Sequence, residues 1–287
     1  NYIIVILFLF PFLAQSQTGD DPLRTNATNE KQTYISAYGE AMVSYDSRYR
    51  TAQANFTRAV VFVGHKFSKN ISFLSETELA DARVEGGKAG GEIALEQAYL
   101  RFQLNRKMHL QAGLFISRIG IINENHLPTT YHGNHRPFTE TFLIPSTWRE
   151  LGVALYGSSD AVTGLNYSIA VVNGLDASGF SNGTGIRGGR FEGGNATASN
   201  IALTGSVQYV MQHFTFQISA YYGGSAGLTK READSLQLNS GMFGTPVGLG
   251  EVNVQYRKDR LTAKVLFAAI SIPQAEQIDR AYANNTA

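Results

Sequence analysis

The stretch that decides the fold is Phe214 to Tyr222, which reads FTFQISAYY. Its apolar and aromatic positions are Phe214, Phe216, Ile218, Ala220 and Tyr222, and they alternate with Thr215, Gln217, Ser219 and Tyr221. A period of two is that of a β-strand, because successive side chains point to opposite faces of a sheet. The stretch therefore predicts a strand whose two faces meet different surroundings.

The same alternation recurs along most of the chain. It is regular in 34–45 and 261–269, and less regular in eight other segments: 57–67, 71–80, 94–104, 110–116, 149–157, 164–172, 201–210 and 248–257. With 214–222 this predicts about eleven strands of roughly 9 to 11 residues, the length that a tilted strand needs to cross an outer membrane.

The predicted connections alternate between long and short along the chain. The long ones are 46–55, 81–91, 117–148, 173–200 and 223–247, and the short ones are 68–70, 105–107, 158–163, 211–212 and 258. Outer-membrane barrels have this asymmetry, with tight periplasmic turns and large outer loops. The sequence therefore predicts an all-β protein, a transmembrane antiparallel up-and-down β-barrel of the porin type. Such a sheet must close, because lipid leaves no partner for an unpaired backbone group.

Composition favours a barrel over a soluble globular protein. Only 16% of residues are charged, against about 25% in an ordinary globular chain, and 29 are glycine. The formal charge of +1 and the lack of a basic cluster argue against a nucleic-acid partner. The chain has no cysteine, which excludes disulfides and thiolate metal ligands, and we expect no cofactor.

The amino terminus predicts export. An apolar run from Tyr2 to Leu13 precedes Ala14-Gln15-Ser16, the small-residue pattern of a signal-peptidase site. We expect a partial signal peptide at 1–16, a periplasmic lead at 17–32 and the barrel at 33–287. Neither a methionine nor a basic segment precedes the run, so we expect the start to be incomplete. About eleven strands is an odd number for a single-chain bacterial barrel, so we expect the carboxyl end to be incomplete as well. A bacterial outer-membrane location follows.

One long segment resembles a known family. The stretch RIGIINENHLPTTYHGNHRPFTETFLIPSTWRELGVALYG, Arg118 to Gly157, is similar to the third outer loop and next strand of Bacteroidetes porins related to the phosphate-selective porin O and P superfamily. GEIALEQAYLRF before it and SIPQAEQIDRAYANNTA after the last strand also resemble that family. The resemblance implies a barrel of about sixteen strands when complete, with the third loop folded into the lumen as a constriction.

Two motifs resemble binding sites, but for each of them an ordinary loop without a bound ligand is the better interpretation. Gly183 to Gly188 fits a dinucleotide fingerprint, but the glycine-rich segment after it predicts no helix. His132 and His135 have the spacing of a metal-ligand pair, but no third ligand accompanies them, so a solvated or pore-facing loop is favoured and no metal is expected.

The polar faces and the third loop supply the candidate pore residues. We expect a constriction formed by Arg118, His126, His132, His135, Arg136, Glu140 and Arg149, and a pore lining formed by Glu40, Arg58, Glu76, Glu78, Arg101, Glu251 and Lys264. The lining residues either act on passing ions or only hydrogen-bond across a hydrated lumen, and both interpretations stay open. The opposite set, which we expect to face lipid, is Ile35, Val43, Leu100, Leu114, Phe216, Val254 and Val265.

The predicted function is a passive diffusion channel for small hydrophilic solutes with a mild, phosphate-like anion preference, because basic residues slightly outnumber acidic ones in the third loop. The expected partners are outer-membrane lipid and lipopolysaccharide and small hydrophilic or anionic solutes, and a homotrimer is an open possibility. No catalytic residues are expected, and the chain is predicted not to be an enzyme. Two alternatives remain: a secreted carbohydrate-binding or adhesive β-sandwich, and an outer-membrane barrel enzyme.

Overall fold

The computed structural model describes residues 31–81, 91–227 and 229–283. The predicted signal peptide at 1–16 and most of the lead at 17–32 lie outside the described residues. The chain divides into two compact units, residues 1–101 and 102–287, and each is considered by itself.

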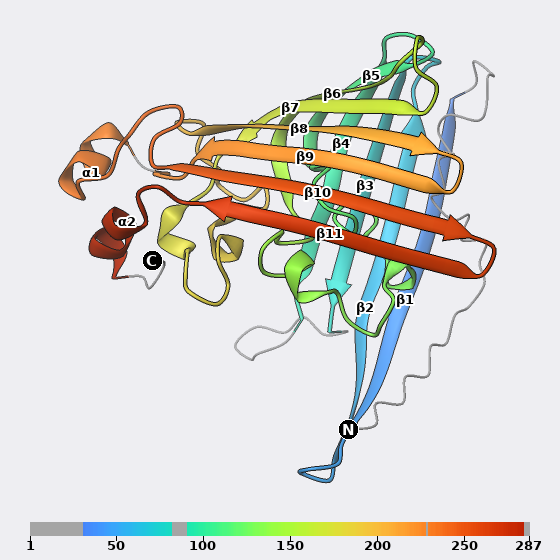
Figure 1. The fold of residues 1–287 in the computed structure, drawn as a ribbon, viewed down its shortest axis with the longest axis horizontal. Coiled ribbons are helices and arrows are strands. Elements are labelled where there is room, and N and C mark those ends of the chain that lie inside the picture. The colour runs from blue at the N-terminus through green and yellow to red at the C-terminus, as the bar shows by residue number, and fades with distance from the viewer. Residues whose placement is uncertain (1–30, 82–90, 228, 284–287) are drawn as a thin grey trace. The chain divides into compact units, whose positions relative to one another are not determined.

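Strands make up most of the described structure (Figure 1). The first unit holds β1 (Gln32–Asp46), β2 (Thr51–Lys66), β3 (Ile71–Ala80) and β4 (Ile93–Gln103), whose last two residues fall in the second unit. The second holds β5 (Met108–Ile116), β6 (Arg149–Ser158), β7 (Leu165–Asn173), β8 (Ile201–Met211), β9 (Phe214–Gly224), β10 (Pro246–Lys258) and β11 (Leu261–Ser271).

The strand order is the chain order, β1 to β11, and the pairing within each unit is antiparallel. This confirms the predicted all-β, up-and-down antiparallel fold. All eleven predicted strands are present, and their ends differ from the predicted ends by at most two residues except at the start of β2. In this order β1 and β11 are the ends of the sheet, and β11 pairs only with β10 among the described residues.

The first connection differs from the prediction. Residues 46–55 were expected to form a long loop, but β1 and β2 continue pairing to Asp46 and Thr51, which leaves a turn at 47–50. Residues 51–56 are exposed on both faces of the hairpin. An element that is exposed on both faces has no reason to alternate apolar and polar residues, so the sequence carries no signal for this extension.

Six short helical segments lie in the connections and after β11. The 3₁₀ turns are η1 (Pro128–Thr130), η2 (Phe138–Glu140), η3 (Ala177–Gly179) and η4 (Arg187–Gly189), and the α-helices are α1 (Lys230–Ser235) and α2 (Ala275–Tyr282). Thr229 and Glu232 cap α1 reciprocally, because each side chain binds the backbone N–H of the other.

No helix in the described ranges is both long enough and apolar enough to cross a membrane.

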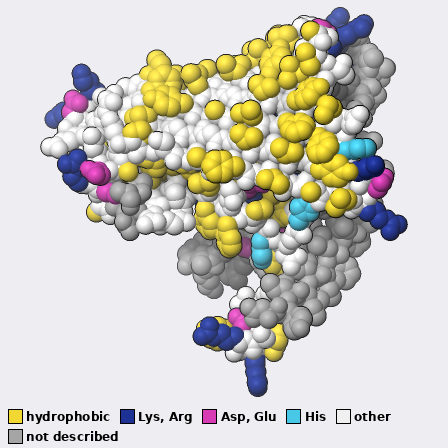
Figure 2. Space-filling view, viewed as in Figure 1, with side chains coloured by type: hydrophobic (Ala, Val, Ile, Leu, Met, Phe, Trp, Pro, Cys, Tyr) yellow, Lys and Arg dark blue, Asp and Glu magenta, His cyan; other side chains and the backbone are white. Residues whose placement is uncertain are grey.

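One face of the second unit is covered by exposed apolar side chains. In β9 the exposed residues are the predicted apolar set: Phe214, Phe216, Ile218, Ala220 and Tyr222. Gln217, Ser219 and Tyr221 point to the other face and are buried. Val252 of β10 and Val265 and Phe267 of β11 continue this face, with 48%, 71% and 72% exposure. Figure 2 shows hydrophobic side chains gathered over these strands.

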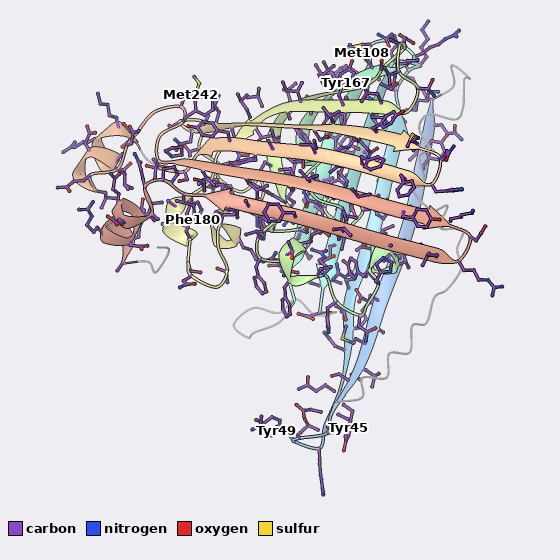
Figure 3. The ribbon with its side chains drawn as sticks, viewed as in Figure 1. Tyr45, Tyr49, Met108, Tyr167, Phe180 and Met242 are labelled. Atoms are coloured by element: carbon purple, nitrogen blue, oxygen red, sulfur yellow. The ribbon has the colours of Figure 1, made fainter. Side chains whose placement is uncertain are left out.

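A glycine in β6 accommodates a tyrosine from the neighbouring strand. Gly157 pairs with Met108 of β5 on one side and Tyr167 of β7 on the other. A Cβ at Gly157 would lie 2.4 Å from the Tyr167 ring, so the ring occupies the space that a side chain would need. Figure 3 shows Met108 and Tyr167 at the same end of these strands.

Candidate functional site

The buried face of β7 to β10 carries a continuous row of polar side chains, which we call the polar row. Its members are Ser168, Ser206, Gln208, Gln217, Ser219, Glu251, Asn253 and Gln255. Glu251 lies at its centre and accepts from Ser219 Oγ at 2.5 Å and from Gln217 Nε2 at 3.0 Å. Buried polar groups must be paired, and these strands pair theirs with one another.

The connection from β5 to β6, residues 117–148, contacts this same face. Gln217 Nε2 donates to Gly120 O at 2.9 Å, and Lys264 Nζ of β11 donates to Thr130 O at 2.9 Å. At its end the Trp148 ring lies 4.6 Å from the Tyr221 ring of β9, and Trp148 is 1% exposed. The loop therefore packs against the polar side of the second unit's wall, opposite the exposed apolar side.

Hydrogen bonds within the loop give it a defined shape. Glu140 Oε1 accepts the backbone N–H groups of Ile121 at 2.5 Å and Ile122 at 2.7 Å. Asn123 joins the two ends of the loop, because its Nδ2 donates to Ser117 O and its Oδ1 accepts from Trp148 N. These hydrogen bonds hold the loop in a defined conformation.

Glu140 is buried, and its surroundings act on its charge in opposite directions. Burial raises its pKa, and this effect exceeds the lowering by the N–H groups of Ile122 and Ile121. Glu251 raises the pKa further, and Lys264 lowers it. The net result is a raised pKa in the part of the loop that faces the polar row.

The other predicted constriction residues in the loop are in four environments. Arg118 pairs with Glu124 at 2.6 Å, which raises the pKa of Arg118, and its guanidinium lies 5.1 Å from the Tyr156 ring centroid. His126 is buried, with Nδ1 3.2 Å from Asn123 O, whereas His132 and His135 are exposed. Arg136 donates to Tyr131 Oη at 2.7 Å and Thr147 Oγ1 at 3.2 Å.

Arg149 differs from the expectation that it would line a constriction. It shares a face of β6 with the exposed Leu151 and Val153, whereas Glu150 points to the other face and binds Asn173 and Trp148. Arg149 Nη2 instead pairs with Glu192 of the β7–β8 connection at 2.6 Å.

The same connection explains why Leu114 is buried although it was predicted to face lipid. Leu114 pairs with the exposed Leu151, so it has the expected orientation. Leu114 is only 6% exposed, because Gly193 lies so close that a Cβ there would be 2.8 Å from the leucine side chain. Ile35, Val43, Leu100, Phe216 and Val265 are exposed, and Val254 is half-buried.

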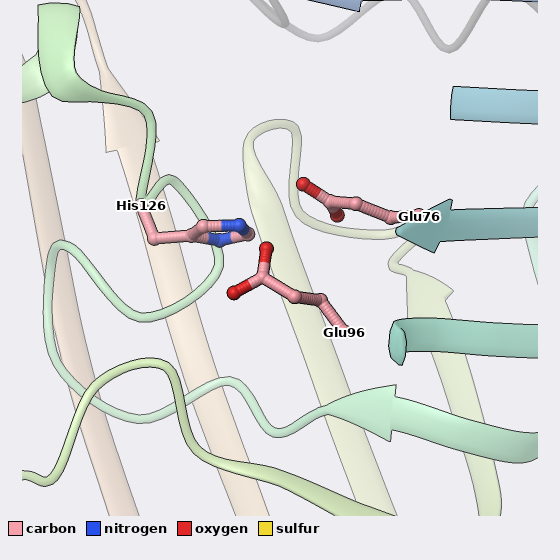
Figure 4. A group of neighbouring side chains, drawn as sticks. All are labelled: Glu76, Glu96 and His126. Carbon is pink, nitrogen blue, oxygen red and sulfur yellow. The ribbon is translucent and has the colours of Figure 1, made fainter. Parts of the chain in front are cut away.

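In the first unit the predicted lining residues form a row across three strands. Arg58 of β2 lies between Glu40 of β1, with Nε to Oε2 at 2.8 Å, and Glu78 of β3, with Nη1 to Oε2 at 3.0 Å. Glu76 of β3 accepts a hydrogen bond from Gln97 Nε2 of β4 at 2.7 Å. Figure 4 shows Glu76 together with Glu96, the residue that precedes Gln97 in β4. The Arg101 guanidinium lies 6.0 Å from the Tyr99 ring centroid.

The sequence interpretation missed two groups of residues at this site. Gln217 and Ser219 were placed on the polar side of a strand but not assigned to the site, although their alternation with apolar residues was a sufficient signal. Arg187 and Arg190 of the β7–β8 connection bind backbone carbonyls of the 117–148 loop, and nothing in the sequence pairs two loops that are more than forty residues apart.

Replacing Glu140 should loosen the 117–148 loop. Glu140→Ala leaves the Ile121 and Ile122 N–H groups unsatisfied, at a cost of about 1–3 kcal/mol for each. Glu140→Gln keeps an acceptor oxygen and should cost less. We expect limited proteolysis within 117–148 to be fastest in Glu140→Ala.

The Glu140 carboxyl should also make the stability of the folded 117–148 loop depend on pH. Because the folded pKa of Glu140 is raised, the folded loop binds the proton more tightly than the unfolded loop, so its stability should increase as the pH falls towards that pKa and decrease above it. Glu140→Gln should remove this dependence. Equal proteolysis rates in all three proteins at every pH would show that Glu140 does not order the loop.

Comparison with known proteins gives a sequence relative and a structural similarity. No family model matches the chain. An uncharacterized protein of Aquifex aeolicus (strain VF5) is 32% identical over 199 residues, which is 68% of this chain and 45% of that protein, so the chain spans about half the length of the curated relative it matches. The solved structure of OmpTdeltaL8, a loop L8 deletion mutant of OmpT and an outer membrane protein of Vibrio cholerae, is similar with a TM-score of 0.38 and 10% identity, over 83% of this chain and 82% of that chain.

The prediction that the chain is not an enzyme is corrected here. The strand topology does not decide enzymatic activity, so an outer-membrane barrel enzyme, one of the alternatives named above, stays open. We therefore withdraw the prediction. The strands themselves define the fold class, which is all-β with up-and-down antiparallel topology.

Proposed function

We propose that this chain forms an outer-membrane β-barrel channel of the porin type, through which small hydrophilic solutes diffuse passively. The observation that carries the proposal is the separation of the two faces in the second unit. One face is apolar and exposed, and the opposite face is polar and receives the long 117–148 loop. A soluble β-sandwich would instead bury its apolar face against a second sheet.

The exposed face has the dimensions of a lipid-facing band. Aromatic rings cluster at one end of β9, where Phe214 lies 5.8 Å from Phe216 and 4.9 Å from Tyr256 between ring centroids. At the other end Tyr222 lies 5.7 Å from Phe243. Phe214 and Tyr222 are separated by about 27 Å along the strand, at roughly 3.4 Å per residue. A tilt of about 40° reduces this to about 20 Å, close to the apolar band of an outer-membrane barrel with aromatic girdles at both interfaces.

The polar face supports a hydrated lumen. Glu251, Asn253 and Gln217 are polar side chains that a lipid face would reject, and they hydrogen-bond to one another on this wall. The loop held on that wall by Gln217 and Lys264 narrows the space beside it. In such a position its basic residues would favour anions mildly, as rings of positive charge do in other pores.

Conductance in a planar lipid bilayer tests this function directly. We expect the purified full-length protein, folded into lipid, to produce stepwise increases of current in symmetrical potassium chloride, without any energy source. A variant that lacks residues 128–141 should conduct more current per step, because the loop no longer narrows the lumen.

Two results would count against the channel. A chain that inserts into bilayers without current would be an outer-membrane barrel of another function, such as an enzyme. A chain that stays soluble and monomeric without detergent would instead support the secreted binding protein.

A further inference from the structure

Four arginines come together where the β5–β6 and β7–β8 connections meet the end of β6. Arg136 belongs to the first connection, Arg149 begins β6, and Arg187 and Arg190 lie in or beside η4. We call them the arginine cluster.

Backbone carbonyls hold two members of the arginine cluster in place. Arg187 Nη1 donates to Thr141 O at 2.9 Å and Ser146 O at 3.0 Å. Arg190 Nη1 donates to Pro145 O and Thr147 O, both at 2.8 Å. Guanidinium groups that are fixed in this way lose little further conformational entropy when they bind a ligand.

The positive charge of the arginine cluster is only partly neutralised. Glu192 bridges Arg149 at 2.6 Å and Arg190 at 2.5 Å, and Glu150, whose charge also acts on Arg190, binds Asn173 and Trp148. Four guanidinium groups outnumber the acidic side chains beside them, so the arginine cluster carries an excess of positive charge. Burial followed by repulsion from Arg136 and Arg149 lowers the pKa of Arg187, and burial lowers the pKa of Arg190 to about 10 despite Glu192.

Several donors of the arginine cluster are left for a ligand. Within the described ranges, Arg187 Nε and Nη2 and Arg136 Nη1 make no hydrogen bond, and Arg149 Nε is buried without a partner. One buried unsatisfied donor, Arg149 Nε, lies beside further unpaired donors and excess positive charge, and a bound anion would complete this arrangement.

The arginine cluster adjoins the apolar face at the loop end of the strands. Arg149 has the same orientation as the exposed Leu151 and Val153, and Gly193, which follows Glu192, lies against Leu114 of that face. If this face contacts lipid, as proposed above, the arginine cluster lies at the level where the hydrocarbon ends and the headgroups begin.

We propose that the arginine cluster binds the phosphate group of a membrane lipid headgroup. A phosphate monoester with two negative charges offsets much of this excess positive charge, and its oxygens match the paired N–H donors of guanidinium groups. This inference rests on the proposed orientation of the apolar face. A free phosphate ion has the same chemistry, and the test below separates the two sources.

Native mass spectrometry of the folded chain in detergent can count bound lipids. The probes are phosphatidic acid, which carries a phosphate monoester, phosphatidylglycerol, which carries a singly charged phosphodiester, and phosphatidylcholine. We expect phosphatidic acid to bind most tightly. Arg187→Gln should weaken its binding roughly tenfold, as the loss of a charged hydrogen-bond donor does, and Arg187→Lys should weaken it less.

Arg231→Gln is the matched control, because Arg231 is an exposed arginine of α1 outside the arginine cluster. If Arg187→Gln does not fold, Arg136→Gln makes the same test, since Arg136 donates to two side-chain hydroxyl groups and its guanidinium otherwise contacts the Tyr131 ring. Equal binding of the three lipids, or equal loss in Arg187→Gln and Arg231→Gln, would overturn the proposal.

Inorganic phosphate separates the two sources. If it displaces phosphatidic acid at the same concentration, the arginine cluster is a site for a dissolved anion and the lipid assignment is wrong. The channel proposal is tested separately from the lipid site. If the chain binds phosphatidic acid in detergent but gives no current in a bilayer, the lipid site stands and the channel proposal is wrong.

Discussion

Replacing Ile218 with arginine should destabilise the folded protein in a membrane by about 2–4 kcal/mol, the cost of a basic side chain at the centre of a lipid-facing strand. Ile218 is 61% exposed and lies midway between Phe214 and Tyr222, the aromatic residues that mark the two ends of the apolar face. If that face meets lipid, Ile218 is near the midplane. Folding into lipid vesicles at increasing urea concentration, followed by the heat-dependent shift in gel mobility, measures the loss.

Arginine at either end of the same strand is the matched control. Phe214→Arg and Tyr222→Arg should cost only about 0–1 kcal/mol for the charge, because a basic side chain near the interface reaches water and headgroups. A cost that peaks at Ile218 supports a lipid-facing band. If all three substitutions cost the same, or if Ile218→Arg is harmless, the exposed face meets water and the channel proposal is wrong.

Reversing the charge of Lys264 should shift ion selectivity from anions toward cations. Lys264 lies on the polar side of β11, where its Nζ binds Thr130 O of the 117–148 loop and its charge lowers the pKa of Glu140. Lys264→Glu replaces one positive charge with one negative charge and removes a donor that holds the loop. Reversal potentials in a salt gradient should therefore move toward cation selectivity, and current per step should rise as the loop loosens.

Salt and a second variant separate these two effects. Lys264→Gln keeps a donor without the charge and should give an intermediate reversal potential. The selectivity shift should be largest at low salt, because the screening length is about 10 Å at 0.1 M and about 3 Å at 1 M. Lys230→Glu, on the exposed helix α1, should leave the reversal potential unchanged. An unchanged potential in conducting Lys264→Glu channels at low salt would place Lys264 away from the permeation path.

Periodicity alone determined the strands. Each strand from β3 to β11 begins and ends within two residues of the predicted ends, because each carries an apolar and a polar face and a shift by one residue would exchange them. The start of β2 was missed for the same physical reason, since residues 51–56 are exposed on both faces and need not alternate. Helix α1 had a local signal, the reciprocal cap between Thr229 and Glu232, which the sequence interpretation did not use.

The candidate site depended on contacts that no local pattern encodes. Gln217 and Gly120 are joined across 97 positions of sequence, and Lys264 and Thr130 across 134. A long loop can reach either face of a sheet, and the sequence does not say which backbone carbonyls will meet the donors of the wall. The predicted position of the 117–148 loop, a constriction in the lumen, came from its length and its family resemblance. The hydrogen bonds show that the loop lies against the polar side of the strands.

The sequence by itself determined the alternation of faces, and with it the strand number and the side on which Glu251, Lys264 and Phe216 lie. Only the tertiary structure decided that Arg149 pairs with Glu192 on the apolar side and that Leu114 is covered by Gly193. The physical reason is that a strand's orientation follows from a period of two within a few residues, whereas burial and ion pairing depend on where distant loops fold back.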